Sequence, residues 1–268
     1  GVSYTLAERN NSYLSFAVAQ EEPTRSDFTD RYKFAADDTY PSSEKLYDWE
    51  LGYQYTAPRL SLGVNLYYMK YKDQLVPTGM VNDDSNALNT NVPDSYRRGV
   101  ELSASWRATG WFTVGANATF SQNRIENYVD ALKDSPTYGK ELGDMTIAYS
   151  PDVIANAFLN FHHRGFEAVF HTQHVGKQYF TNNENDALSL DAYCVTNLNL
   201  AYTFRTRSAR SVRLGLLINN LFNAEYESNG YGYSYMDTWS GPAPVRIDEA
   251  YYFPQAPLNV LANVTVKF

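Results

Sequence analysis

The chain has few of the residues that many folds use to stabilise themselves. Cys194 is the only cysteine among 268 residues, which excludes an intrachain disulfide and a cluster of thiolate ligands. It shares an apolar face with Thr196, Leu198 and Leu200, so we expect it to be a small buried hydrophobic residue. No run approaches the roughly 18 apolar residues that a membrane-spanning helix requires.

Signatures of catalysis and of metal binding are also missing. The four histidines form no H-x-x-x-H or H-E-x-x-H pattern, and the chain lacks G-x-S-x-G, Walker, zinc and EF-hand signatures. The net charge of −8 argues against a nucleic-acid partner. We therefore expect no enzyme and no cofactor. The run 182–186 could hold calcium through oxygen ligands, but most acids here read as solvated loop charge.

Apolar residues alternate with small polar residues over segments of about ten residues. One segment has Leu60, Leu62, Val64, Leu66 and Tyr68 on its apolar face, and the last eleven residues show the same period of two. Strands of soluble proteins are typically about five or six residues long. Alternation over about ten residues is typical of a strand that spans a membrane, with its apolar side chains in lipid.

Eleven strands of this kind are predicted, joined alternately by tight and long connections. We place them at residues 2–6, 12–20, 45–56, 60–71, 95–107, 111–127, 151–163, 166–180, 190–204, 211–227 and 255–268. The long connections are residues 21–44, 72–94, 128–150, 181–189 and 228–254. Outer-membrane barrels have short periplasmic turns and long extracellular loops, so the pattern also predicts the orientation.

Aromatic and basic residues also distinguish the end with the tight turns from the end with the long loops. One aromatic girdle is predicted near the tight turns, and a second near the long loops from Tyr47, Trp49, Tyr67, Tyr68, Phe120 and Tyr226. Every tight turn has an arginine in it or beside it, which either contacts anionic headgroups or is merely solvated. Outer-membrane lipid is thus a predicted partner.

Eleven strands cannot sit in lipid as an open sheet, because two unpaired edges would leave backbone groups without partners. Single-chain bacterial barrels also have even strand numbers. The sequence therefore predicts an all-β, antiparallel, up-and-down transmembrane β-barrel of which this chain is only a part.

Several segments resemble the later barrel strands of TonB-dependent outer-membrane receptors. They are residues 22–28, 41–53, 95–102, the stretch Ile218-Asn219-Asn220-Leu221-Phe222-Asn223-Ala224-Glu225-Tyr226 and the ending from Phe253 to Phe268, and they occur in family order. The resemblance implies a barrel of about 22 strands with a plugged lumen. It implies that residues 1–268 are the C-terminal part of that barrel. The plug domain and the TonB-contacting segment would then both be absent from this chain.

Candidate ligand-binding residues lie in the last long loop and on the upper inner wall. Aromatic rings can stack on a ligand and donate hydrogen bonds, although each could equally pack its own loop. Basic side chains that face inward would suit an anionic ferric chelate. The predicted set is Tyr231, Tyr233, Tyr235, Trp239, Arg246, Arg97 and Lys177, with Tyr251, Tyr252, His171 and Gln173 near them.

The resemblance implies active uptake of a scarce nutrient across the outer membrane of a Gram-negative bacterium, coupled to TonB. An iron–siderophore complex is the expected cargo, and cobalamin or an oligosaccharide is the alternative. Two other classes remain open. One is a passive porin-like channel, which needs no plug, and the other is a soluble β-rich binding module.

Overall fold

The computed structural model describes residues 1–29, 40–81 and 86–268, which form antiparallel strands with very little helix. The helical segments are α1 (Arg25–Thr29) and the 3-10 turn η1 (Asp186–Leu188). In these ranges no helix combines the length and the apolar character needed to cross a membrane. The strands are β1 (Val2–Ala7), β2 (Asn10–Glu21), β3 (Glu44–Thr56), β4 (Leu60–Val81), β5 (Ala87–Arg107), β6 (Phe112–Ile125), β7 (Met145–Thr146), β8 (Val153–His163), β9 (Phe166–Val175), β10 (Gln178–Tyr179), β11 (Ser189–Leu190), β12 (Tyr193–Phe204), β13 (Ser211–Asn219), β14 (Glu227–Asp237), β15 (Val245–Pro254) and β16 (Asn259–Lys267).

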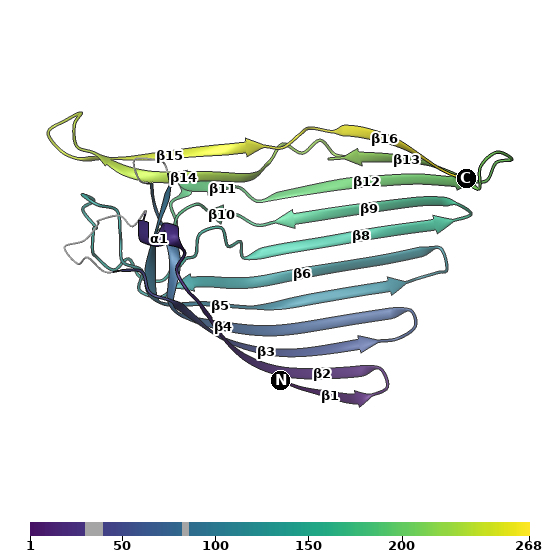
Figure 1. Cartoon of the computed structure of the whole chain (residues 1–268), viewed down its shortest axis with the longest axis horizontal. Helices are drawn as coiled ribbons and strands as arrows, with labels where there is room; N and C mark the ends of the chain where they lie inside the picture. The colour runs from purple at the N-terminus through teal and green to yellow at the C-terminus, as the bar shows by residue number, and fades with distance from the viewer. Residues whose placement is uncertain (30–39, 82–85) are drawn as a thin grey trace.

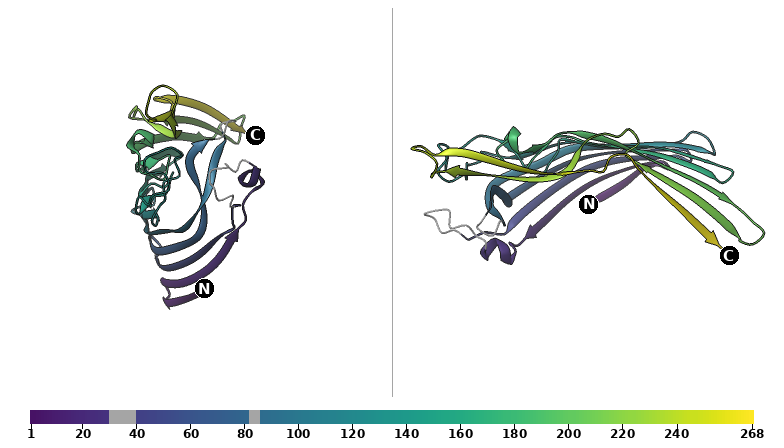
Figure 2. Two further views of the ribbon diagram at one scale, coloured as in Figure 1. Left: turned by 90° about the vertical axis from the view of Figure 1, so that its left-hand side faces the viewer. Right: turned by 90° about the horizontal axis from the view of Figure 1, so that it is seen from above.

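The main sheet has the order β1-β2-β3-β4-β5-β6-β8-β9-β12-β13-β16, with the short β7 beside β6. These eleven strands correspond one to one with the predicted strands, and each pairs antiparallel with its neighbours (Figure 1). The sheet is curved but open, with β1 and β16 as its two edges (Figure 2). The prediction of an antiparallel, partial barrel is confirmed.

The two faces of the sheet differ in chemistry. Leu14, Leu51, Leu66 and Val100 lie directly opposite one another on successive strands of the outer face. The first three are about half exposed, and no second sheet covers them in the described part of the chain. The inner face carries small polar residues such as Asn65 and Asn117, together with acids. An uncovered apolar outer face needs hydrocarbon around it, as a transmembrane barrel wall does.

The strand register corrects two predictions about individual residues. Cys194 is exposed on the outer face, next to His174 on β9, so the expectation of a buried cysteine was wrong. The alternation was read correctly, but the apolar face of this sheet meets lipid instead of a protein core. Tyr67 lies opposite Glu50 on the inner face of the sheet, so it does not belong to the aromatic girdle predicted near the long loops. Trp49, Tyr68 and Phe120 are exposed, as the girdle requires.

The tight turns gather at one end of the sheet and the long connections at the other (Figure 1). Between β8 and β9 the turn consists of Arg164 and Gly165, which have φ angles of 48° and 85°. Two successive positive φ angles match the right-handed twist of a hairpin. A Cβ atom on Gly165 would lie 2.3 Å from the carbonyl oxygen of Thr203, so the turn also needs glycine for a close approach to β12.

Two of the predicted long loops are strands. Residues 72–81 continue β4 and residues 87–94 belong to β5, and the two strands pair as far as Val81 and Ala87. Residues 228–254 form the hairpin β14–β15, which is a separate two-stranded sheet. Conversely, β13 ends at Asn219 instead of residue 227 because Asn220 and Asn223 adopt positive φ angles of 51° and 53°.

The asparagines at the end of β13 connect the wall to the long connections. The side chain of Asn219 donates a hydrogen bond to Asn259 (2.9 Å) on the neighbouring strand β16. Asn220 accepts from the backbone N–H of Ala224 and donates to its carbonyl oxygen, each at 2.8 Å. These bonds fix the point at which the chain leaves the sheet for the hairpin β14–β15.

Buried apolar residues gather at the long-connection end. One cluster joins Val76 and Val92 of the β4–β5 extension to Ile125, Tyr128 and Ile147. A second cluster consists of Phe180, Leu188 and Leu190, with Ala250 of β15 against it. The long connections, which we call the outer connections, therefore have packed cores of their own. These cores hold the polar groups of the connections in fixed positions.

Candidate functional site

The hairpin β14–β15 presents an aromatic face. Tyr231, Tyr233 and Tyr235 alternate along β14, so they project to the same side. Tyr251 of β15 lies directly opposite Tyr231, and their rings are stacked with centroids 5.0 Å apart and planes 15° apart. The rings of Tyr233 and Tyr251 follow at 6.3 Å. We call these four residues, together with Glu249, the tyrosine face.

Glu249 lies at the centre of the tyrosine face and was not singled out by the sequence analysis. It is opposite Tyr233, and its carboxylate accepts hydrogen bonds from the hydroxyls of Tyr233 (2.6 Å), Tyr251 (2.8 Å) and Tyr235 (3.2 Å). Hydrogen bonds from Tyr233 and Tyr251 lower the pKa of Glu249. The sequence signal for Glu249 was its spacing of two residues from Tyr251, which in a strand places both side chains on one face. The segment was predicted to be a loop, in which this spacing has no such meaning.

The opposite face of the hairpin is anchored to the rest of the protein. A Cβ atom on Gly230 would lie 2.7 Å from the Phe180 ring, and one on Gly232 would lie 2.9 Å from Leu188. Tyr252 is on this side too, and the centroid of its ring lies 5.8 Å from that of Phe180. Glycine therefore lets the hairpin approach the second buried cluster closely and leaves the tyrosine face pointing away from it.

Two predicted residues of this loop lie apart from the tyrosine face. Arg246 is on the anchored side, where its Nε donates to Asp248 (2.8 Å) and its Nη2 to Ser234 (3.1 Å). Trp239 is in the connection between the two strands and is 87% exposed, with its backbone N–H bonded to Asp237 (2.9 Å). The structure thus brings together three of the five predicted residues of the hairpin.

Arg97 and Lys177 are elsewhere. Arg97, on the inner wall, donates to Ser150 (2.8 Å) and lines a cavity of about 330 Å³ together with Glu50, Tyr67 and Glu101. Lys177 follows β9, and its ammonium group lies 2.5 Å from Asp186 and 5.0 Å from the ring centroid of Tyr179.

The charge of Lys177 is compensated within the protein. Its hydrogen bond to Asp186 raises the pKa of the lysine, so the two side chains remain a charged pair at neutral pH. Arg246 is compensated by Asp248 in the same way. Neither residue offers an unpaired positive charge to a ligand.

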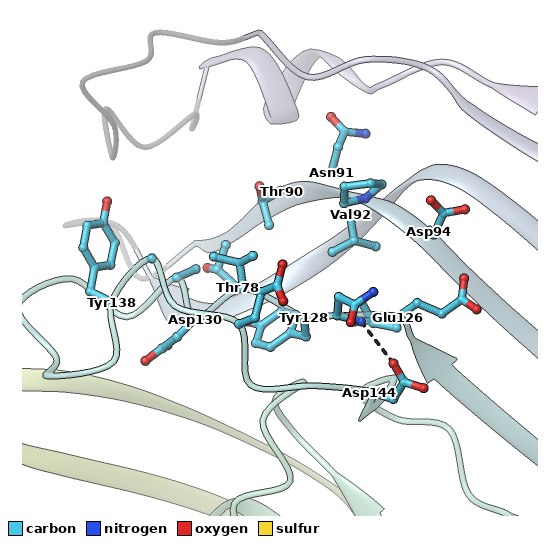
Figure 3. A pocket seen from close by; sticks show the side chains of 17 residues that line it. Thr78, Thr90, Asn91, Val92, Asp94, Glu126, Tyr128, Asp130, Tyr138 and Asp144 are labelled. Atoms are coloured by element: carbon cyan, nitrogen blue, oxygen red, sulfur yellow. Dashed lines mark hydrogen bonds between the residues drawn. The ribbon is translucent and has the colours of Figure 1, made fainter.

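A larger cavity, of about 760 Å³, lies between the β4–β5 extension and the connection from β6 to β8 (Figure 3). It is lined by five carboxylates from separate parts of the chain, and none of its described lining residues is a lysine or an arginine. Asp144 accepts a hydrogen bond from the backbone N–H of Asn127 (3.1 Å), and Asp130 accepts one from Thr137 (2.5 Å). The five are Asp94, Glu126, Asp130, Glu141 and Asp144. The sequence could not reveal this cavity, because only the tertiary structure brings these segments together.

We expect the wall of this cavity to open at alkaline pH. Burial, followed by the charge of Asp130, raises the pKa of Tyr128 to about 12. Because the pKa is raised in the folded state, the protonated Tyr128 hydroxyl contributes its full stabilisation of the folded connection below pH 10. This stabilisation is lost as the pH rises from about 10 to about 12. Two pH units correspond to about 2–3 kcal/mol.

Proteolysis of residues 126–144 over this pH range measures the opening. Tyr128→Phe keeps the packing but removes the ionisable hydroxyl, so its connection should stay resistant where the wild type becomes sensitive. Equal sensitivity of both proteins would show that another group controls the opening.

The acidic run considered as a calcium ligand set is engaged by protein partners. Glu184 accepts from the backbone N–H of Thr146 (3.0 Å) and from the guanidinium of Arg124, and Asn185 accepts from the N–H of Ala187 (3.1 Å) at the start of η1. In the described ranges no three His, Cys, Asp or Glu side chains are grouped to hold a metal ion. The run ties connections together.

Comparison with known proteins identifies the family. A family model described as TonB dependent receptor-like, beta-barrel, matches residues 1–221. The chain belongs to this family. TonB-dependent receptor barrels lie in the outer membrane of Gram-negative bacteria and are not enzymes, so both predictions are confirmed.

Solved structures share the fold. The ferric yersiniabactin uptake receptor FyuA from Yersinia pestis superposes with a TM-score of 0.68 at 19% identity, over 99% of this chain and 36% of that one. The siderophore receptor PiuA from Acinetobacter baumannii gives 0.69 at 14%, over 98% and 34%. The copper transporter OprC gives 0.70 at 19%, over 98% and 38%. The chain spans about a third of the length of these TonB-dependent receptors and resembles their barrels.

Proposed function

We propose that this chain forms part of the barrel wall and outer connections of a TonB-coupled transporter that takes up an iron–siderophore complex. The complete receptor then has a barrel of about 22 strands, with a plug domain and a TonB-contacting segment N-terminal to residues 1–268. The main sheet is open, and the chain covers about a third of related structures such as FyuA; both observations support this division.

The tyrosine face is the observation that carries the proposal of a ligand-binding receptor. Stacked rings with hydroxyls held around one carboxylate offer both an apolar surface and hydrogen-bonding groups, with little conformational entropy to lose. Several structural relatives are named for iron complexes, among them receptors for ferric yersiniabactin and ferric preacinetobactin. These names support an iron chelate over cobalamin or an oligosaccharide.

The charged residues of the outer connections indicate which net charge the iron chelate should have. The inward-facing basic residues Arg97 and Lys177 predict an anionic chelate, yet Lys177 is paired with Asp186. Arg246 of the hairpin is likewise paired with Asp248.

Five acids line the cavity of about 760 Å³, of which Asp94 and Glu126 are paired with Lys70 and Lys72. The other three, Asp130, Glu141 and Asp144, have no lysine or arginine partner among the described residues and leave the cavity wall negative. A chelate that is neutral or positively charged as a whole avoids this negative potential. We therefore propose a neutral or cationic iron–siderophore complex.

A binding screen tests the cargo. The complete receptor in detergent is titrated calorimetrically with iron chelates of negative, zero and positive charge, with cobalamin and with oligosaccharides. We expect the neutral or cationic chelates to bind best. Binding of cobalamin or a glycan in the absence of any chelate binding would contradict the proposed cargo.

An uptake assay in whole cells tests the coupling. Accumulation of labelled iron from the bound chelate should stop when TonB is deleted or the proton gradient is collapsed. Uptake that continues under both conditions would instead indicate a passive channel.

A further inference from the structure

Arg98 carries a positive charge on the lipid-facing surface of the sheet. It lies on β5 directly between Tyr68 of β4 and Gln122 of β6, two residues from Val100 on the same face. Trp49, which is exposed, lies opposite Tyr68 in the same row, so Arg98 is at the depth of the aromatic girdle near the long loops. An arginine at this depth is close to the headgroups of the outer leaflet.

Neighbouring cations on this surface are neutralised within the chain, whereas Arg98 is not. Lys70 and Arg124 lie one row further out, on either side of Tyr96. Among the described residues, the guanidinium of Arg98 has no carboxylate partner and bonds only to Gln122. A charge beside hydrocarbon is costly unless it is paired, so Arg98 calls for an anion from outside the chain. The partners of the two other cations are Asp94 and Glu126 for Lys70 and Glu184 for Arg124.

The guanidinium of Arg98 is held in one orientation. Its Nε and Nη2 both donate to the Oε1 atom of Gln122, at 2.9 and 2.5 Å. Its Cζ atom lies 5.1 Å from the ring centroid of Tyr96, and that ring stacks with Tyr68 at 6.3 Å. These contacts use two of the five N–H groups of an arginine. The others remain for the oxygens of a phosphate, which the planar fork of a guanidinium binds well.

A hollow of about 560 Å³ lies on the same surface, closer to the tight turns. Leu102 borders it and is four residues along β5 from Arg98, which corresponds to about 13 Å at about 3.3 Å per residue. The strand register places small side chains side by side on three neighbouring strands. We call this region the alanine hollow; its small residues are Ala104, Ala116, Ala118, Ala155 and Ala157.

The position of the alanine hollow relative to Arg98 indicates what occupies both. In a membrane no hydrophobic force drives groups together, so close packing against small side chains decides what binds. A lipid can place its phosphate at Arg98 and an acyl chain along β5 and β6 into the hollow. Free phosphate would use only the guanidinium, and a neighbouring protein packed on the alanines would leave the charge unpaired.

We propose that Arg98 and the alanine hollow form a binding site for one phosphate-bearing lipid of the outer leaflet. The lipid phosphate accepts hydrogen bonds from Arg98, and one acyl chain packs on the alanines. The site is on the outside of the barrel wall, so it is separate from the tyrosine face and from the proposed cargo.

Native mass spectrometry of the complete receptor in detergent tests the proposal. The delipidated receptor is titrated with lipid A, which has phosphate groups and several acyl chains, and with dephosphorylated lipid A. We expect the tightest site to hold one lipid A molecule, and we expect dephosphorylation to weaken binding by about fivefold or more. Inorganic phosphate at the same concentration as the lipid should not compete.

Arg98→Gln should weaken binding of lipid A by about fivefold, which is the usual contribution of one basic side chain at a lipid surface. Arg97→Gln is the matched control, because this neighbouring arginine lies on the inner wall and should not affect lipid binding. If Arg98→Gln lowers the yield of folded receptor, Gln122→Leu is the second variant. It keeps the charge but releases the guanidinium, so a smaller loss is expected.

Ala157→Leu tests the alanine hollow. The added side chain occupies part of the hollow, so lipid A should bind about two- to fivefold more weakly, since only dispersion contacts between carbon atoms are lost. Ala262→Leu is its control, because Ala262 is on the same outer face but on β16, opposite Leu216 and outside the hollow.

Three results would overturn the site. The first is equal binding of lipid A to the wild type and to Arg98→Gln. The second is equal binding of lipid A and its dephosphorylated form to the wild type. The third is displacement of lipid A by an equal concentration of inorganic phosphate, which would identify Arg98 as a site for the free anion.

Discussion

Replacement of Asn182 with alanine should separate three connections at the outer end of the protein. The side chain is fully buried, and its Nδ2 donates to the carbonyl oxygen of Pro77 (2.6 Å) in the β4–β5 extension. Its Oδ1 accepts from the backbone N–H of Ala148 (2.7 Å) in the connection between β7 and β8. Two backbone groups lose their partners in the variant. At about 1–3 kcal/mol for each, we expect the docking of these connections to weaken by about 2–6 kcal/mol.

Hydrogen exchange at the amide of Ala148 measures this loss locally. The rate should rise by orders of magnitude in Asn182→Ala, while amides in the centre of the sheet remain protected. Asn183→Ala is the control, because its side chain accepts a hydrogen bond from the hydroxyl of Thr181 (2.7 Å) and, among the described residues, holds no backbone group. If both variants exchange at the wild-type rate, Asn182 does not hold these connections together.

The second large effect is expected from Gly99→Ala in the middle of β5. A Cβ atom at this position would lie 2.4 Å from the backbone oxygen of Phe120 and 2.6 Å from the hydroxyl of Tyr67. The Tyr67 side chain can move, but the oxygen of Phe120 is held in the sheet. The strands β5 and β6 must therefore shift, and overpacking of this kind costs about 1–3 kcal/mol or more.

Gel mobility of the unheated receptor reports on this variant, because a folded barrel migrates differently from the denatured chain. Gly99→Ala should lower the temperature at which the folded form disappears. Gly110→Ala is a suitable control, since no heavy atom lies within 4 Å of the Cβ that it adds. A melting temperature for Gly99→Ala equal to that of the control would show that the sheet absorbs the extra methyl group.

The candidate site could be predicted only in part. The aromatic residues of the last long connection were found from composition, because tyrosine is abundant there. Glu249 was missed because its importance depends on pairing with Tyr233 across the hairpin. Arg246 and Tyr252 were included because the side chains of a loop cannot be assigned to one face or the other from sequence. In the strand β15 both project from the side of the hairpin away from the tyrosine face.

The extension of β4 and β5 was missed for a related reason. Residues 72–94 contain Pro77, Pro93 and several Asn and Asp, which read as a loop by local preference. In the structure the two strands stay paired because Val76 and Val92 are buried with Ile125 and Tyr128 from another part of the chain. Tertiary burial outweighed the local signal.

The amino-acid sequence by itself determined the eleven strands, their up-and-down order and the two chemical faces of the sheet. These features follow from a period of two and from short turns, which act between residues close in the chain. Only the tertiary structure decided where charges are paired, which carboxylates line one cavity and which oxygens meet at Glu249. Those features depend on contacts between segments tens of residues apart, whose relative positions no local pattern encodes.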